Sequence, residues 1–303
     1  MNENTYIIER ITNRPSGKLD VVIDTDTYNE IDDQFAVCYA LSADDKLNVK
    51  ALYAAPFFNS LSEGPKDGME KSYEEIVKLL SSMGRKHENF AFKGSERYLE
   101  DRNKPCDNPA VRDLIKKAME ADEEHPLYVA AIGAITNVAS AILIEPEIVK
   151  RIVVVWLGGH VYHYIHTREF NMFQDKAAAN VVFDSKVPLV QIPCKGVASQ
   201  LITSLYDLKA HLQGKNKMCD TLLEIYKACA KDHFGYGRVI WDISTIAWLI
   251  NPEWVPCSFV SSPMVNENDR YSFDQTRHLI SCAFDVNRNA IFKDMYKRLT
   301  CGG

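Results

Sequence analysis

Five acidic residues lie within ten positions of one another in the stretch VVIDTDTYNEIDDQF. They are Asp24, Asp26, Glu30, Asp32 and Asp33. Carboxylates held a few ångströms apart repel one another and raise each other's pKa unless a cation compensates. Any one of these acids alone could simply favour a helix N-terminus or a turn. The whole set instead predicts a site for a divalent cation that prefers oxygen ligands, such as calcium or magnesium.

A strand and a helix must position these acids. Residues 19–24 (LDVVID) have the apolar, β-branched character of a buried strand, and residues 32–41 (DDQFAVCYAL) carry an apolar helical face. In a doubly wound sheet, ligands bind in the crevice beyond the carboxyl ends of the strands. We therefore expect Asp26 and the Asp32–Asp33 pair to converge at that crevice.

The rest of the chain alternates β-branched runs with segments of helical period, which predicts an α/β fold with a mostly parallel open sheet and helices on both faces. With 303 residues, 46% of them hydrophobic, we expect a single domain over residues 1–303 and disorder only at the two termini. The expected strands are 49–55, 90–92, 127–131, 152–157 and 189–192. The expected helices are 70–83, 110–121, 136–144 and 177–184, with mainly helical structure over 197–249 interrupted by a loop at 231–238.

Composition argues against several classes of partner. The net charge of −6 gives no general attraction for nucleic acid polymers or an anionic membrane surface. The eight cysteines form no CxxC pair and no zinc-type cluster with histidine, so we expect reduced thiols. The polar start of the chain does not resemble a signal peptide, and no run is long enough to span a bilayer. These features predict a soluble, cytoplasmic protein.

The acidic stretch resembles the signature of the nucleoside hydrolase family, a strand followed by DxDPGxDD. Asp24-Thr25-Asp26 and Asp32-Asp33 match it, whereas the loop 27–31 is two residues longer and lacks Pro-Gly. The resemblance implies a Rossmann-like nucleoside hydrolase fold and a homo-oligomer, either dimer or tetramer. It also implies calcium-dependent hydrolysis of the N-glycosidic bond of ribonucleosides, which gives ribose and free base.

Three further segments carry the resemblance. Residues 131–137 (AIGAITN) are similar to the family's PTGPLTN turn, in which a backbone carbonyl binds the metal, here that of Ile132. Residues 156–159 and 168–171 (WLGG and REFN) resemble the family's GG and EFN elements. Trp241-Asp242 resembles its late HD or WD pair.

Each matching position implies a role. The implied metal ligands are Asp26, Asp33, Asp242 and the carbonyl of Ile132, and Asp26 is also the candidate general base. The implied contacts to the sugar hydroxyls are Asp32, Glu169, Asn171 and His163, the last at a position where many family members carry asparagine. Although histidines recur every three residues from His160 to His166, the segment follows a Gly-Gly turn, which disfavours a zinc site.

Trp241 takes the place of the histidine that protonates the leaving base in many family members. An indole is not a general acid at neutral pH. The residue resembles the tryptophan of purine-preferring members, which stacks on the base and eases its protonation from solvent, so we expect a purine preference. The alternative is that Trp241 is a core residue, like Trp248.

Two other functions remain open from the sequence. Asp24-Thr25-Asp26 also fits the beginning of a haloacid dehalogenase-like magnesium phosphatase, but Tyr28 departs from that signature, and there the second acidic pair comes late in the chain. A calcium-loaded protein that binds nucleosides or sugars without turnover is the other alternative, because motifs alone do not prove catalysis.

Overall fold

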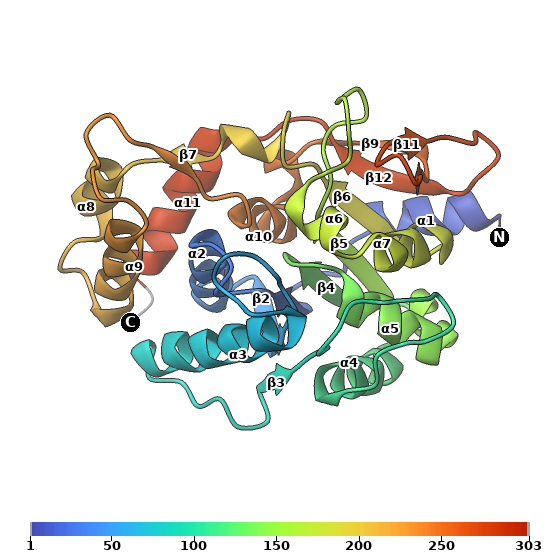
Figure 1. The fold of residues 1–303 in the computed structure, drawn as a ribbon, viewed down its shortest axis with the longest axis horizontal. Coiled ribbons are helices and arrows are strands. Elements are labelled where there is room, and N and C mark those ends of the chain that lie inside the picture. Colours follow the sequence, from blue (N-terminus) through green and yellow to red (C-terminus); the bar gives the residue numbers. More distant parts are fainter. Residues whose placement is uncertain (1, 302–303) are drawn as a thin grey trace.

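A mixed sheet of eight strands forms the centre of the molecule. The computed structural model describes residues 2–301, and the order of the strands in its large sheet is β3-β2-β1-β4-β5-β6-β12-β9. Only β9 runs antiparallel to its neighbour, so the predicted mostly parallel sheet is confirmed (Figure 1). The strands are β1 (Leu19–Thr25), β2 (Leu47–Ala54), β3 (Ala91–Lys93), β4 (Leu127–Ala131), β5 (Ile152–Leu157), β6 (Leu189–Ile192), β9 (Cys257–Ser261) and β12 (Leu279–Ala283).

Helices cover both faces of this sheet, as predicted. Successive side chains of a strand point to opposite faces. On β5, Val153 and Val155 accordingly belong to one apolar core and Val154 to the other, and all three are fully buried. The first core contains residues of α1 (Glu3–Thr12), α2 (Asp32–Leu41), α3 (Pro65–Ser82), α8 (Leu205–Leu212), α9 (Lys217–Ala228), α10 (Ile243–Ile250) and α11 (Arg288–Cys301). The second contains residues of α4 (Pro109–Glu120), α5 (Thr136–Ile144) and α7 (Lys176–Asp184).

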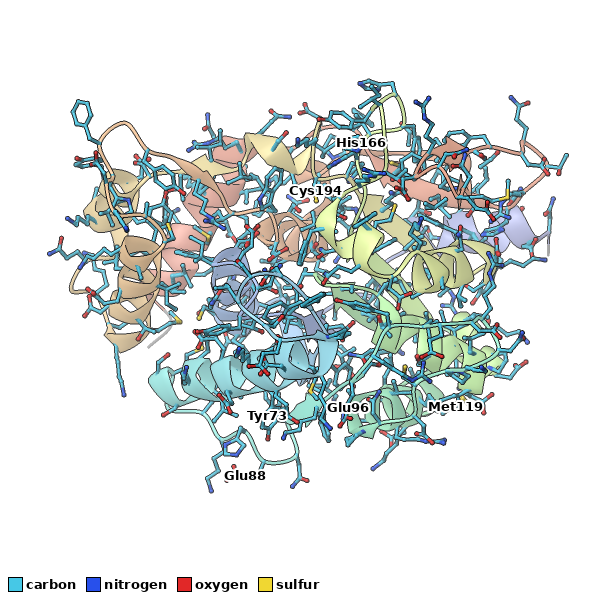
Figure 2. The ribbon with its side chains drawn as sticks, in the orientation of Figure 1. Tyr73, Glu88, Glu96, Met119, His166 and Cys194 are labelled. Carbon is cyan, nitrogen blue, oxygen red and sulfur yellow. The ribbon has the colours of Figure 1, made fainter. Side chains whose placement is uncertain are left out.

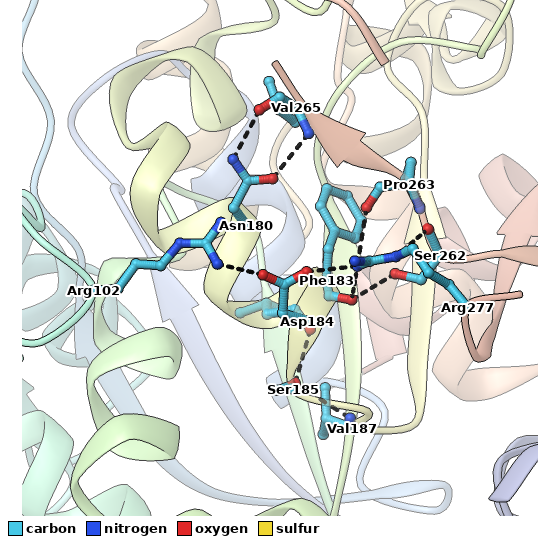
Figure 3. Close-up of polar contacts among 11 residues, drawn as sticks. Arg102, Asn180, Phe183, Asp184, Ser185, Val187, Ser262, Pro263, Val265 and Arg277 are labelled. Atoms are coloured by element: carbon cyan, nitrogen blue, oxygen red, sulfur yellow. Dashed lines mark hydrogen bonds and ion pairs between the residues drawn. The ribbon is translucent and has the colours of Figure 1, made fainter. Parts of the chain in front are cut away.

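Two small hairpins lie outside the large sheet, β7 (Ile202–Thr203) with β8 (Arg238–Val239) and β10 (Met264–Val265) with β11 (Tyr271–Ser272). Figure 3 shows how α7 holds the second hairpin. The side chain of Asn180 pairs with both backbone groups of Val265, at 2.9 Å each, as a neighbouring strand would. One helical turn later, Asp184 accepts hydrogen bonds from Arg102 and Arg277. The hairpin is therefore fixed to the helix that follows the EFN element.

Most predicted elements are confirmed to within two residues, but α3 begins five residues earlier than expected, at Pro65. The expected terminal disorder is not found at either end of residues 2–301, because α1 and α11 lie there, and residues 1, 302 and 303 lie outside the described range. All eight cysteines are free thiols, as predicted. None of the helices in residues 2–301 combines the length and the apolar character needed to cross a membrane.

The N-terminal helix contributes to the core through Ile7, which is fully buried. Truncating a buried isoleucine leaves a cavity, so Ile7→Ala is expected to lower the free energy of unfolding by about 2–5 kcal/mol in a denaturant titration. Thr5→Ala is the matched control, because Thr5 is exposed on the same helix. If the two variants unfolded at the same denaturant concentration, the packing of α1 against the sheet would be contradicted.

Candidate active site

A cavity of about 240 Å³ opens at the carboxyl ends of the central strands. Loops after β1, β4, β5 and β6 contribute to it, together with the segment that leads into α10. This is the crevice in which α/β sheets bind their ligands. Every residue assigned to the site from the sequence, except His163, lines the cavity. These residues are Asp26, Asp32, Asp33, Ile132, Glu169, Asn171, Trp241 and Asp242.

Four buried aspartates form the floor of this cavity. Carboxylate oxygens of Asp32, Asp33 and Asp242 lie within 4.8 Å of one another, close enough to share one metal ion. Asp26 lies beside them, and both of its carboxylate oxygens are buried without a hydrogen-bond partner. Buried polar atoms normally have a partner, so this pair of unpartnered oxygens fits a site for a cation or a polar ligand.

The electrostatics of the floor also favour a cation. Burial is the main cause that raises the pKa of Asp26, Asp32 and Asp242 well above the usual range, and repulsion among the carboxylates adds to it. Burial likewise raises the pKa of Asp33 to about 7. The charge of Arg238 acts on Asp32, but its guanidinium is paired with Glu30 at 2.7 Å. Hard carboxylate oxygens with excess negative charge fit calcium or magnesium.

Neighbouring groups hold the aspartates in place. Thr25 Oγ1 donates to Asp33 Oδ1 at 2.5 Å, and the backbone N–H of Trp241 donates to Asp32 Oδ2 at 3.0 Å. A Cβ at Gly133 would lie 3.0 Å from Asp26 Oδ1, so the glycine gives this carboxylate its room. The N-terminus of α2, with its positive dipole end, begins at Asp32 itself.

Asp24 has a supporting role outside the cavity. Its Oδ1 accepts a hydrogen bond of 2.7 Å from Asn137 Nδ2, which joins the end of β1 to the first turn of α5. Asn137 also binds Ser95 through its Oδ1, at 2.9 Å to the backbone N–H. The DxD motif thus contributes one acid to the cavity and one to the packing beneath it.

The longer loop 27–31 folds back over the acids. The N–H of Asn29 donates to the carbonyl of Asp26 at 2.7 Å and closes a turn. The side chain of Asn59 then binds Asn29 Oδ1 at 2.6 Å. Asn29 and Glu30 both line the cavity as a result. The acidic spacing alone did not predict this path.

The side chains of Glu169 and Asn171 in the EFN element, which were predicted to contact the sugar, also form hydrogen bonds within the protein. Glu169 caps α6 (Phe170–Gln174) and accepts hydrogen bonds from the N–H groups of Gly159, Asn171 and Met172. The side-chain NH₂ of Asn171 donates to the carbonyls of Ile132 and Leu157, at 3.1 and 3.0 Å. Asn171 therefore orients the Ile132 carbonyl predicted to bind metal and keeps its own Oδ1 for a ligand.

The structure does not bring His163 to the cavity, because its side chain is exposed on the loop between β5 and α6. His160 and His166 line the cavity instead, with ring centroids 5.8 Å apart. The three-residue spacing does not place the rings on one face because this segment is a loop and not a helix. Within residues 2–301, the acids Asp32, Asp33 and Asp242 form the metal-type cluster, and the histidines do not contribute to it.

Trp241 lies at the cavity and not in the centre of the core. It is half-buried, packs against the edge of the core and precedes α10, whereas Trp248 is buried within that helix. The indole is thus available to a ligand next to Asp32 and Asp242.

Several cavity residues had received no individual site role from the sequence, namely Asn29, His160, His166, Arg168, Cys194 and Lys195. A signal existed for Cys194 and Lys195, which come directly after β6, where the carboxyl end of another parallel strand meets the crevice. The loop residues had no such signal because contacts distant in sequence set their positions.

The chain belongs to the inosine-uridine preferring nucleoside hydrolase family, whose model matches residues 21–293. The chain is 32% identical over 158 residues to the pyrimidine-specific ribonucleoside hydrolase RihA of Enterobacter sp. (strain 638), with half of each protein covered. It is 23% identical over 257 residues to the non-specific ribonucleoside hydrolase RihC of Salmonella schwarzengrund (strain CVM19633), covering 78% of this chain and 80% of RihC. The chain spans only about half the length of RihA, and likewise about half the length of the pyrimidine-specific ribonucleoside hydrolase RihB of Shigella flexneri serotype 5b (strain 8401).

Solved structures share the fold. A plant nucleoside hydrolase, PpNRh1, superposes with a TM-score of 0.74 at 20% identity, covering 93% of this chain and 99% of that one. The purine-preferring ribonucleoside hydrolase from Gardnerella vaginalis gives a TM-score of 0.73 at 18% identity, with 93% and 98% covered. The expected nucleoside hydrolase fold is therefore confirmed.

The buried acids make stability depend on pH in a defined direction. Burial raises the pKa of Asp24 and of Asp33 to about 7, so the folded chain holds these protons more tightly than the unfolded chain does. In chelator-treated protein, the free energy of unfolding is expected to fall by at least about 1 kcal/mol as the pH rises from about 5 to about 8. Saturating calcium should remove most of this loss. If the stability of the chelated protein stayed level or rose over this pH range, the raised pKa of these buried aspartates would be contradicted.

Proposed function

We propose that this protein hydrolyses the N-glycosidic bond of ribonucleosides with a bound calcium ion, releasing ribose and the free base. The observation that carries the proposal is the pair of unpartnered Asp26 oxygens beside the Asp32, Asp33 and Asp242 cluster in a cavity. Membership of the nucleoside hydrolase family supports it. The nucleoside is the partner we propose for this cavity.

Asp26, Asp33, Asp242 and the carbonyl of Ile132 would hold the cation. When bound, the cation supplies positive charge that offsets the buried carboxylates and acidifies a water molecule. Calcium suits this donor set because it accepts several carboxylate and carbonyl oxygens in flexible geometry. Asp32 lies within the same 4.8 Å cluster, so its carboxylate adds negative charge to the site whether or not it touches the ion.

Asp26 would accept the proton of the attacking water. Its carboxylate oxygens have no protein donor that would compete for this role. The burial that raises its pKa also makes it a stronger base than an exposed aspartate. The water then adds its oxygen to the anomeric carbon while the bond to the base nitrogen breaks.

The ribose would lie between the aspartates and the EFN element. Asp32 and the Oδ1 of Asn171 would bind its hydroxyls, and Glu169 would accept a further hydrogen bond beyond those from its three backbone donors. Holding the ring in one orientation favours attack on the anomeric carbon. A deoxyribose would leave these buried groups without a partner, which costs roughly 1–3 kcal/mol for each group.

Trp241 would stack on the base and favour purines. Its half-buried indole lines the cavity next to the acids, and a purine overlaps more of that surface than a pyrimidine does. The similar proteins differ in the preference that their names give, since RihA is named pyrimidine-specific and the Gardnerella protein purine-preferring. The preference is therefore argued from Trp241 alone.

Of the two alternatives, the phosphatase loses its basis because the chain belongs to a different family. The second alternative, a non-catalytic binding protein, is distinguished from the proposed hydrolase by experiment.

A panel of purine and pyrimidine nucleosides, incubated with calcium-loaded protein, should yield free base, and prolonged chelation should stop its release. Tight nucleoside binding in calorimetry without any released base would overturn the proposal in favour of a binding protein.

Asp26→Asn tests the proposed base most directly. The substitution keeps the shape of the side chain but removes its charge, so kcat is expected to fall roughly 10²- to 10⁴-fold. Folding should be retained or slightly improved in thermal unfolding of the metal-free protein, because one buried carboxylate is lost. If Asp26→Asn kept more than a tenth of the wild-type kcat, Asp26 would not be the base.

The tryptophan is tested with two leaving groups. Trp241→Ala is expected to lower kcat/KM for a purine riboside by about tenfold or more, whereas Trp241→Phe should retain much of the activity. The nitrophenolate of a nitrophenyl riboside leaves as a stable anion and needs no protonation, so hydrolysis of this substrate should fall much less. Equal losses on the two substrates would indicate structural damage, and a wild-type preference for uridine or cytidine would contradict the purine assignment.

A further inference from the structure

The cavity that is lined by the aspartates also has a basic wall, formed by four side chains that can donate hydrogen bonds. His160, His166, Arg168 and Lys195 all line it, and none of them was assigned a role above. In Figure 2, His166 lies near Cys194, which directly precedes Lys195 in the chain. An enzyme that bound only neutral nucleosides would have no electrostatic need for this wall.

Backbone contacts place these residues around the EFN element. Gly159 donates its N–H to Glu169 at 2.8 Å, and its carbonyl accepts the N–H of Cys194 at 2.8 Å. The residue that follows Gly159 is His160, the one that follows Cys194 is Lys195, and the one that precedes Glu169 is Arg168. The basic wall thus begins one residue beyond the groups proposed to hold the ribose.

Hydrogen bonds fix which nitrogen of each histidine can donate. The Nδ1 of His160 accepts the N–H of Lys195 at 3.4 Å, and the Nδ1 of His166 accepts the N–H of Arg168 at 3.2 Å. A neutral imidazole that accepts at Nδ1 carries its proton at Nε2. Both rings therefore have an Nε2–H donor for an anion. Burial and the charge of Lys195 lower the pKa of His160 to about 4, which keeps this ring neutral.

One carboxylate, that of Asp269, pairs with two cations next to this wall. Arg168 and Lys176 both pair with the carboxylate of Asp269, at 2.7 and 2.6 Å, so two cations share one anion. No carboxylate among residues 2–301 forms an ion pair with Lys195, whose Nζ donates to the hydroxyl of Tyr164 at 3.2 Å. Glu169 follows Arg168 in the chain, and three backbone N–H groups already neutralise part of its charge.

Contacts far along the chain hold this arrangement in place. The N–H of Thr167 donates to the carbonyl of Asp269 at 2.7 Å, next to the Arg168 ion pair. Gly159 has φ +77°, and a Cβ there would lie 2.0 Å from the hydroxyl of Tyr271. The hairpin β10–β11 thus braces the loop that carries the donors, so the donors are preorganised for a ligand.

We propose that the basic wall binds a phosphate on the 5′ oxygen of the ribose, so that the substrate class is ribonucleoside 5′-monophosphates. The inference rests on the proposed hydrolase function, since it extends the ribose beyond Glu169 and Asn171. With the 2′ and 3′ hydroxyls at the aspartates and the base at Trp241, the 5′ carbon is the remaining end of the nucleoside. Arginine, lysine and imidazole N–H groups are the donors that phosphate oxygens favour.

The reaction stays a simple hydrolysis. Water adds its OH to the anomeric carbon, and its remaining proton balances the released base nitrogen. The products are ribose 5-phosphate and the free base. The phosphate ester is not cleaved, and no oxidant or second substrate is needed.

Two measurements test the inference, one with turnover and one without. The first is the ratio of kcat/KM for a ribonucleoside 5′-monophosphate to that for the matching nucleoside. We expect a ratio of at least about ten in the wild type, equivalent to about 1.4 kcal/mol. The double variant Arg168→Ala/Lys195→Ala should lower this ratio at least tenfold. The control is Lys18→Ala, which removes an exposed lysine at the opposite end of β1 and should leave the ratio unchanged.

The second measurement is calorimetric binding of ribose 5-phosphate, ribose and inorganic phosphate to the calcium-loaded protein. Ribose 5-phosphate should bind at least tenfold more tightly than either of the others, and the double variant should lose that advantage. Release of base from nucleosides but not from 5′-monophosphates would overturn the inference and leave the proposed hydrolase intact. If no substrate released base but ribose 5-phosphate kept its advantage, the hydrolase would fail and the phosphate site would stand. Equal binding of ribose 5-phosphate and inorganic phosphate would overturn the site.

Discussion

The burial of four carboxylates at one point is the constraint on which the active site depends. Moving Asp26, Asp32, Asp33 and Asp242 out of water costs free energy that the protein's own charges do not offset, since the guanidinium nearby is already paired with Glu30. These four buried carboxylates must therefore either stay protonated or bind a cation. The proposed chemistry uses the second state, in which Asp26 is free to accept a proton.

The sheet makes such a concentration of charge possible. Parallel strands buried on both faces end at the same edge, so residues that directly follow β1, β4, β5 and β6 meet there although they are distant in sequence. Asn171 shows how rigid this edge is, because its side chain joins the carbonyls at the ends of β4 and β5. Acidic and basic side chains thereby line the same cavity, which suits a ligand that carries both hydroxyls and an anion.

The sequence predicted the strands and the acids because both depend on local patterns. A continuous apolar run marks β5, and the spacing of Asp26, Asp32 and Asp33 marks the metal site. Loop geometry could not be predicted in the same way. The position of Arg168 depends on Asp269, a hundred residues later, so spacing alone favoured His163 where the fold brings in His160 and His166. The helix α1 was not predicted either. Most of its residues are polar, and only a few apolar residues, such as Ile7 and Ile11, are buried.

Direct measurement of calcium binding tests the central claim that the buried acids require a cation. Metal-stripped protein, titrated with calcium chloride in a calorimeter at neutral pH, should bind one ion per chain and release protons as it does so, because the ion displaces them from the carboxylates. Asp242→Ala should abolish this binding. Asp20→Ala is the control and should leave the binding intact, because Asp20 lies near the start of β1 and its partly exposed side chain pairs with Lys50. A protein that bound no calcium, or that bound it equally well without Asp242, would contradict the account.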